Sequence, residues 1–138
     1  MKVVETRRRV LGKEHPDTLS IMAILALTYR SEGRWKEAEE LGVKVLETRE
    51  RVLGQEHPGT LISMSDLAST YCNQGRWKES EELGVKVVET RKRVLGQEHP
   101  DTLTSMSNLA YTRKSQSRLA EAITVPTEPA NPRSVDGG

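Results

Sequence analysis

Three Glu-His pairs are the residues of this sequence whose types best suit metal chemistry. Carboxylate and imidazole groups both bind zinc when they converge within about 2 Å of one ion. The pairs recur every 42 residues, as Glu14-His15, Glu56-His57 and Glu98-His99. If the copies stack in layers with helix axes about 8–10 Å apart, equivalent histidines lie in a row and cannot share an ion. We therefore interpret the histidines as residues that position a link between helices or cap a helix, and we predict no metal and no cofactor.

Nucleophilic catalysis is the second chemistry that the residue types allow. Serine, histidine and aspartate all occur, but no serine has the flanking glycines of a nucleophile elbow. The one cysteine, Cys72, has histidines only at distant points of the chain. We therefore predict that the protein is not an enzyme.

The composition argues against two classes of partner. The 138 residues include 21 Lys plus Arg and 20 Asp plus Glu, and the net charge of +1 creates no field that attracts DNA or an anionic membrane. The basic residues are not clustered with aromatic residues on which nucleic-acid bases would stack. The longest apolar run, residues 21–27, is far shorter than the roughly 20 residues of a membrane span. We predict no nucleic-acid partner and no membrane partner.

The cysteine count and the N-terminus bear on location. One cysteine forms no internal disulfide, which agrees with a reducing compartment. The first eleven residues, MKVVETRRRVL, lack the apolar core of a signal peptide. We predict a cytoplasmic location.

Internal repetition dominates the organisation of the chain. Residues 9–19, 51–61 and 93–103 read RVLGKEHPDTL, RVLGQEHPGTL and RVLGQEHPDTL. Residues 34–75 and 76–117 are identical at 31 of 42 positions. Repeats of this length are typical of solenoids, in which each unit buries its apolar face against its neighbours.

Each repeat contains two amphipathic helices and no strand pattern. In the longer helix, Trp35, Ala38, Leu41, Val45, Thr48 and Val52 follow one another at steps of three or four. In the shorter helix, the stripe is Leu61, Met64, Ala68, Tyr71 and Gly75. The predicted helices span residues 2–11, 17–32, 34–53, 59–74, 76–95 and 101–116. Gly42 and Gly84 lie inside the longer helices at a cost of about 0.8–1 kcal/mol each relative to alanine, and we favour neutral drift over a close backbone approach as the explanation.

The predicted organisation is three repeats over residues 1–122 and a disordered tail over residues 123–138. A fourth copy of the longer helix is expected to begin at Arg118, but Pro126 stops it after a short stretch. From there, PTEPANPRSVDGG holds three prolines and two glycines and has no apolar period.

The residues of the repeat resemble a known family. Leu67-Ala68, Tyr71, Gly75, Trp77 and Ser80 resemble the tetratricopeptide repeat (TPR). The 42-residue period with its Gly-x-x-His-Pro link is similar to the kinesin-light-chain subtype, and RWKEAEEL with ETRERVLGQEHP resembles the C-terminal arrays of fungal NOD-like (NACHT/NB-ARC) receptors. The resemblance implies an all-α fold, a right-handed α-solenoid of antiparallel helix pairs in a TPR-like superhelix. It also implies a scaffold or sensor that binds proteins or peptides along a concave face lined by the shorter helices.

The chain departs from the pattern in two respects. It lacks the phosphate loop GxxxxGK[ST] that the nucleotide-binding switch of such receptors needs. In the third repeat, Ser117, Arg113 and Leu119 replace the glycine, the tyrosine and the tryptophan. These substitutions make the last repeat more polar, as expected of a terminal repeat that faces water.

The repeats differ most where the family geometry places the concave face. Five of the 11 differences between the two full repeats fall on concave positions, which indicates either a recognition surface or a face free to vary, and we favour recognition. We predict that Ile24 and Leu27 anchor an apolar side chain of an extended peptide, while Asp66, Asn73, Asn108 and Lys114 orient it. The predicted groove residues are Ile24, Leu27, Arg30, Ile62, Asp66, Ser69, Asn73, Asn108, Tyr111 and Lys114.

Self-association is the alternative function. The first longer helix lacks a preceding partner and carries Val3, Val10 and Leu11. An uncovered solenoid end favours docking of a second copy, so these three residues are the predicted contact of a homodimer. The same open end would also result if an upstream part of a larger receptor were missing.

Overall fold

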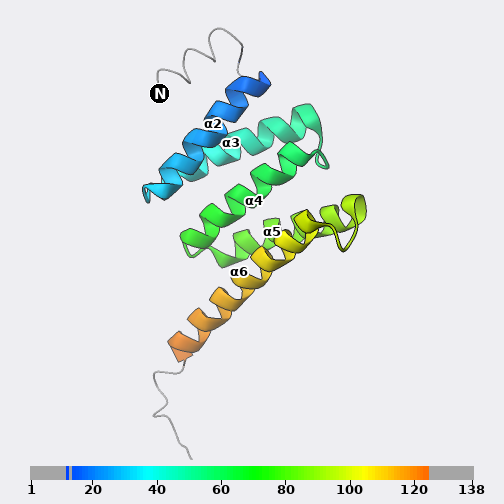
Figure 1. The fold of residues 1–138 in the computed structure, drawn as a ribbon. Helices are drawn as coiled ribbons and strands as arrows, with labels where there is room; N and C mark the ends of the chain where they lie inside the picture. Colours follow the sequence, from blue (N-terminus) through cyan, green and yellow to red (C-terminus); the bar gives the residue numbers. More distant parts are fainter. Residues whose placement is uncertain (1–11, 13, 125–138) are drawn as a thin grey trace, which may run out of the picture.

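The computed structural model of the chain describes residue 12 and residues 14–124. This part consists of five helices and has no strands. The helices are α2 (Pro16–Ser31), α3 (Trp35–Leu53), α4 (Pro58–Asn73), α5 (Trp77–Leu95) and α6 (Pro100–Thr124). The shorter helices α2 and α4 lie with α6 in one layer, and α3 and α5 form the other (Figure 1). The predicted all-α solenoid is confirmed, while the predicted helix at residues 2–11 lies outside the described residues.

A histidine caps the N-terminus of each of the helices α2, α4 and α6. The Nδ1 atom of His57 accepts a hydrogen bond of 2.9 Å from the backbone N–H of Gly59. His15 and His99 accept the equivalent bonds, both of 3.1 Å, from the N–H groups of Asp17 and Asp101. A proline follows each histidine at the first helical position, where no N–H is needed. The helix-capping interpretation of the histidines is confirmed.

The core is a thin layer of aliphatic side chains centred on α4. Helix α4 packs against α3 on one side and α5 on the other, so its apolar residues are covered from both. The buried cluster consists of Leu46, Leu61, Met64, Leu67 and Val87. Since every helix contacts mainly its neighbours in the chain, the apolar stripes of the sequence account for the packing.

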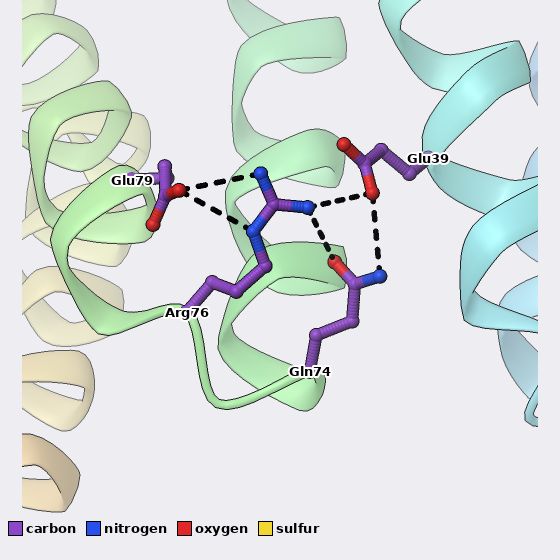
Figure 2. A network of polar contacts seen from close by, with 4 residues as sticks. All are labelled: Glu39, Gln74, Arg76 and Glu79. Atoms are coloured by element: carbon purple, nitrogen blue, oxygen red, sulfur yellow. Dashed lines mark hydrogen bonds and ion pairs between the residues drawn. The ribbon is translucent and has the colours of Figure 1, made fainter.

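The turn between α4 and α5 is held by Arg76 (Figure 2). Its guanidinium bonds Glu39 of α3 at 2.7 Å on one side and Glu79 of α5 at 3.2 Å on the other. The side chain of Gln74 joins the network by donating to Glu39 at 3.3 Å. The Arg76 guanidinium also lies 4.4 Å from the ring centroid of Tyr71. This arginine therefore ties the turn to the preceding longer helix.

The third repeat has no such turn. Gly33 and Gly75 adopt φ values of +79° and +77° after α2 and α4, where the chain reverses. Ser117 occupies the third copy of that position, and a serine avoids the left-handed region. Helix α6 therefore runs on without a break to Thr124. The separate helix predicted to begin at Arg118 is wrong, and the predicted tail boundary at residue 123 falls inside α6, whereas residues 125–138 lie outside the described part.

The two glycines inside the longer helices differ in how close the neighbouring side chains lie. A Cβ atom added to Gly84 would lie 3.1 Å from Cδ1 of Leu109, closer than ordinary van der Waals contact. A Cβ added to Gly42 would lie 3.4 Å from Cδ1 of Leu67, which is ordinary contact. The preference for drift stays a prediction, and the tight contact at Gly84 favours close approach at that position.

These distances predict different effects for the same substitution. Gly42→Ala is expected to raise the free energy of unfolding by up to about 1 kcal/mol, because alanine favours the helix. Gly84→Ala is expected to gain clearly less, since its methyl group presses on Leu109. Urea denaturation of both variants measures the difference. Equal stabilisation would show that the contact with Leu109 is unimportant.

Candidate functional site

Two pockets open between the helices, one after the other along the array. The N-terminal pocket lies between α2, α3 and α4, and the C-terminal pocket lies between α4, α5 and α6. The N-terminal pocket is lined by Ala23, Ala26, Leu27, Ala38, Gly42, Val45, Ser63, Asp66, Leu67 and Thr70. All ten positions recur 42 residues later in the C-terminal pocket, which adds Cys72, Asn73 and Tyr111. The repeat therefore builds the same pocket twice.

The floor of each pocket comes from a longer helix and is made of small residues. Gly42 and Ala38 of α3 occupy it in the first pocket, and Gly84 and Ser80 of α5 in the second. Sequence reasoning missed this floor because it assigned Ala38 only to the packing stripe. The signal that was present is a glycine inside the helix at the same position of both repeats.

The N-terminal pocket is narrow and mostly apolar. Its cavity volume is about 20 Å³, which is room for one water molecule. The α2 wall is formed by Ala23, Ala26 and Leu27, and Asp66 lies opposite on α4. Arg30 spans the two helices, donating from Nη1 to the backbone oxygen of Asp66 at 3.3 Å. The pocket therefore offers an apolar wall beside one carboxylate.

Burial sets the ionisation of the charged groups near that wall. Burial raises the pKa of the Asp66 carboxyl, although the charges of Arg30 and Arg49 act in the opposite direction. Burial also lowers the pKa of Arg49. Arg49 donates to Ser63 Oγ at 2.9 Å and to the Gly59 carbonyl at 3.2 Å. The carboxylate of Asp66 is therefore held at a cost that its two arginine neighbours only partly offset.

The C-terminal pocket is larger and neutral. Its cavity volume is about 120 Å³. Ser69 and Cys72 stand where the first repeat has Leu27 and Arg30, so shorter side chains leave the space open. Ser80 Oγ and Thr112 Oγ1 lie 3.3 Å apart in a hydrogen bond at the pocket wall. None of the lining residues, all of which belong to the described part of the chain, is charged.

The chain matches the family model of the tetratricopeptide repeat over residues 1–17, 18–59 and 60–101. The chain belongs to the tetratricopeptide repeat family. Its TPR fold is similar to that of solved kinesin light chain-like proteins. A search of curated proteins finds no match.

Two solved structures of a Podosopora anserina kinesin light chain-like protein with nearly identical TPR-like repeats are 33% identical to this TPR chain. Their TM-scores are 0.72 and 0.70, and the match covers 93% of this chain and 65% of that one. BtubC (BKLC) from P. vanneervenii is 17% identical, with a TM-score of 0.74 over 98% of this chain and 57% of its own. The likeness to BtubC shows the fold alone. The chain thus spans less than two thirds of the length of these relatives, and its predicted link to fungal NOD-like receptors stays a prediction.

The TPR pockets bring together six of the ten predicted groove residues. Leu27 and Asp66 line the N-terminal pocket. The C-terminal pocket contains Ser69, Asn73, Asn108 and Tyr111. The remaining four, outside both linings, are Ile24, Arg30, Ile62 and Lys114.

The remaining predictions concern the apolar anchor, the oligomer contact, metal ions and membrane helices. The side chains of Ile24 and Ile62 are exposed. Of the two residues predicted to form the apolar anchor, Ile24 and Leu27, only Leu27 lines a pocket. The predicted oligomer contact of Val3, Val10 and Leu11 lies outside the described residues. Within residues 12 and 14–124, no three His, Cys, Asp or Glu side chains gather into a group that would hold a metal ion. No helix of the same part has the length and apolarity needed to cross a membrane.

The raised pKa of Asp66 predicts a pH-dependent effect of Asp66→Asn. Because the folded-state pKa lies above the unfolded value, the ionised carboxylate destabilises the fold, and this cost is absent at low pH. Asp66→Asn is therefore expected to raise the melting temperature at pH 7, with the gain vanishing as the pH falls towards 3. Asparagine is native at the same position of the third repeat, Asn108. Thermal melts between pH 3 and 7 measure the effect, and a loss of stability at pH 7 would show that Asp66 is held by net attraction.

Proposed function

We propose that this TPR chain is a non-catalytic protein-binding scaffold whose two pockets hold neighbouring side chains of one extended partner segment. TPR proteins as a class mediate protein–protein interaction. The observation that carries the proposal is that the same ten lining positions form both pockets, with different side chains at four of them. A constant framework with varied contact residues is suited to reading two different side chains.

The spacing of the repeats suits an extended segment. Helices packed side by side have axes about 8–10 Å apart, and an extended chain advances about 3.3 Å per residue. Because side chains on one face of an extended chain recur every two residues, side chains about two to four residues apart are expected to reach consecutive pockets. The main-chain groups of such a segment would contact polar residues that line the C-terminal pocket, among them Asn73 and Asn108.

The pockets favour different side chains. The C-terminal pocket, lined by Ser69, Asn73 and Thr112, suits an uncharged polar side chain such as an amide or a hydroxyl. The N-terminal pocket is too narrow for a large anchor, so a small apolar group is expected to rest against Leu27. The deeper anchor of the partner is thus assigned to the C-terminal pocket and not to Ile24 and Leu27.

Peptide selection on the full chain tests this function. Random peptides displayed on phage are selected on the chain, and the affinity of a selected peptide is measured by fluorescence anisotropy. Ser69→Leu is expected to weaken binding at least tenfold, because leucine fills the C-terminal pocket. Leucine is native at the same repeat position, Leu27, so the fold should tolerate it.

The matched variant is Leu27→Ser, which transfers the second-repeat residue to the first pocket. It is expected to weaken binding less than Ser69→Leu, because the first pocket holds the smaller group. Circular dichroism confirms that both variants keep their helices. Unchanged affinity in Ser69→Leu would place the binding surface elsewhere.

The proposal also includes a role as the sensor of a receptor and a cytoplasmic location. The second candidate function is self-association through one end of the array.

A further inference from the structure

The outer face of α6 is uncovered where equivalent faces are buried. Leucine at the fourth position of the shorter helices is 3% exposed in Leu19 and Leu61 but 50% exposed in Leu103. The methionine three residues later is 5% exposed in Met22 and 1% in Met64 but 40% exposed in Met106. In the first two repeats a following longer helix, α3 or α5, packs on this face. We call Leu103, Met106 and Ala110 the open face of α6.

The first two repeats share an ion pair whose arginine is missing in the third repeat among the described residues. Arg51 of α3 bonds Glu14 at 2.6 Å, and Arg93 of α5 makes the same bond with Glu56. The third copy of this glutamate is Glu98, which has no ion-pair partner within the part of the chain that the structure describes. Among the described residues, the open face therefore has neither an apolar neighbour nor an arginine partner for Glu98.

Residues 2–11 carry both of the missing groups. Their sequence, KVVETRRRVL, is identical to residues 86–95 at nine of ten positions. Val3 corresponds to Val87, which is fully buried in one cluster with Leu61 and Met64. Arg9 corresponds to Arg93, the partner of Glu56. A segment with this sequence is chemically complementary to the open face.

The segment that reaches the open face comes from a second copy. Helices α2 and α6 lie at opposite ends of the array (Figure 1), and residues 2–11 lead into α2. The chain after α6 is unsuited to the role, because residues 126–138 contain three prolines, which interrupt a helix.

We propose that copies of this chain associate head to tail, with residues 2–11 of one copy on the open face of α6 of another. Val3 packs against Leu103 and Met106, and Arg9 pairs with Glu98. The contact continues the alternation of longer and shorter helices from one copy into the next. Because the two surfaces differ, the association is heterologous and builds open chains, in contrast to a closed two-fold dimer. It uses neither pocket, so it is independent of the proposed groove function.

The repeat also indicates which N-terminal residues matter. Val10 and Leu11 correspond to Val94 and Leu95, which are exposed even inside the array. Val3 corresponds to a buried residue, so it is the anchor of the contact and Val10 is peripheral to it.

Mixing two blocked variants tests the proposal. Sedimentation velocity over a concentration series is expected to show that the unmodified chain grows beyond a dimer. Leu103→Glu blocks the open face, Val3→Glu blocks the segment, and each variant alone is expected to be monomeric. An equimolar mixture is expected to form a 1:1 dimer that grows no further, because only one intact contact remains. Ile62→Glu, at another exposed apolar position, is the control and is expected to associate like the unmodified chain.

Each other outcome overturns the proposal. A monomeric unmodified chain, or a mixture that stays monomeric, excludes the contact. If Leu103→Glu is monomeric but Val3→Glu still dimerises, the open faces of two copies meet each other instead. Since Leu103 is half exposed, the folded state of Leu103→Glu is checked by circular dichroism, and retained peptide binding by this variant separates the contact from the groove.

Discussion

Replacing Met64 with alanine is expected to lower the free energy of unfolding by about 2–5 kcal/mol, the range for truncating a buried core side chain. Met64 is 1% exposed and packs in the cluster that joins α3, α4 and α5. Its loss leaves a cavity at the centre of the array, where both neighbouring helices are affected. Small domains have only about 5–15 kcal/mol of stability in total, so this variant is expected to melt at a much lower temperature. Urea denaturation followed by circular dichroism measures the loss.

The control for Met64→Ala is the same substitution at the same repeat position of α6. Met106 is 40% exposed, so Met106→Ala is expected to cost less than about 1 kcal/mol. Both variants are compared at a dilution at which the chain is monomeric, because association would cover Met106. An equal cost for the two variants would contradict the account in which the following longer helix buries this position.

Replacing Gly75 with alanine is expected to cost about 1–2 kcal/mol, the strain of placing an L-residue in the left-handed region. Gly75 has a φ of +77° in the turn where the N–H of Arg76 donates to the carbonyl of Tyr71 at 2.8 Å. The strain acts on the turn that orients α5 against α4, so the floor of the C-terminal pocket is also affected. Thermal and urea unfolding measure the effect.

Ser117 provides the matched control for Gly75. It occupies the same repeat position but lies inside the continuous helix α6, so Ser117→Ala is expected to change stability by less than about 0.5 kcal/mol. If Gly75→Ala proves as neutral as Ser117→Ala, the turn after α4 does not depend on the glycine. A residue other than Ser117 must then explain why the third repeat has no such turn.

Three substitutions explain why one backbone forms two different pockets. Leu27, Arg30 and Asp66 at the first pocket become Ser69, Cys72 and Asn108 at the second. The first set narrows the pocket and places an arginine across it, and the second set opens a neutral cavity. The framework residues that position both pockets hardly change. A repeat array can therefore vary the size and charge of its pockets without altering how it folds.

The sequence by itself determined the helices, their caps and the family. Four of the predicted helices agree with α2, α3, α4 and α5 to within one residue at each end. The histidine caps follow from a His-Pro pair at the start of each shorter helix. These features depend on residues a few positions apart, so a local pattern repeated every 42 residues contains the information.

Only the tertiary structure decided which surfaces of those helices are covered. The pocket floors at Gly42 and Gly84 exist because a longer helix lies under two shorter ones. The exposure of Leu103 depends on the absence of a following helix pair in the described part of the chain. Leu61 and Leu103 lie in nearly identical local sequences, yet one is buried and the other half exposed. The physical reason is that burial is a property of neighbouring helices, and neighbours are set by the position of a repeat in the array rather than by its own residues.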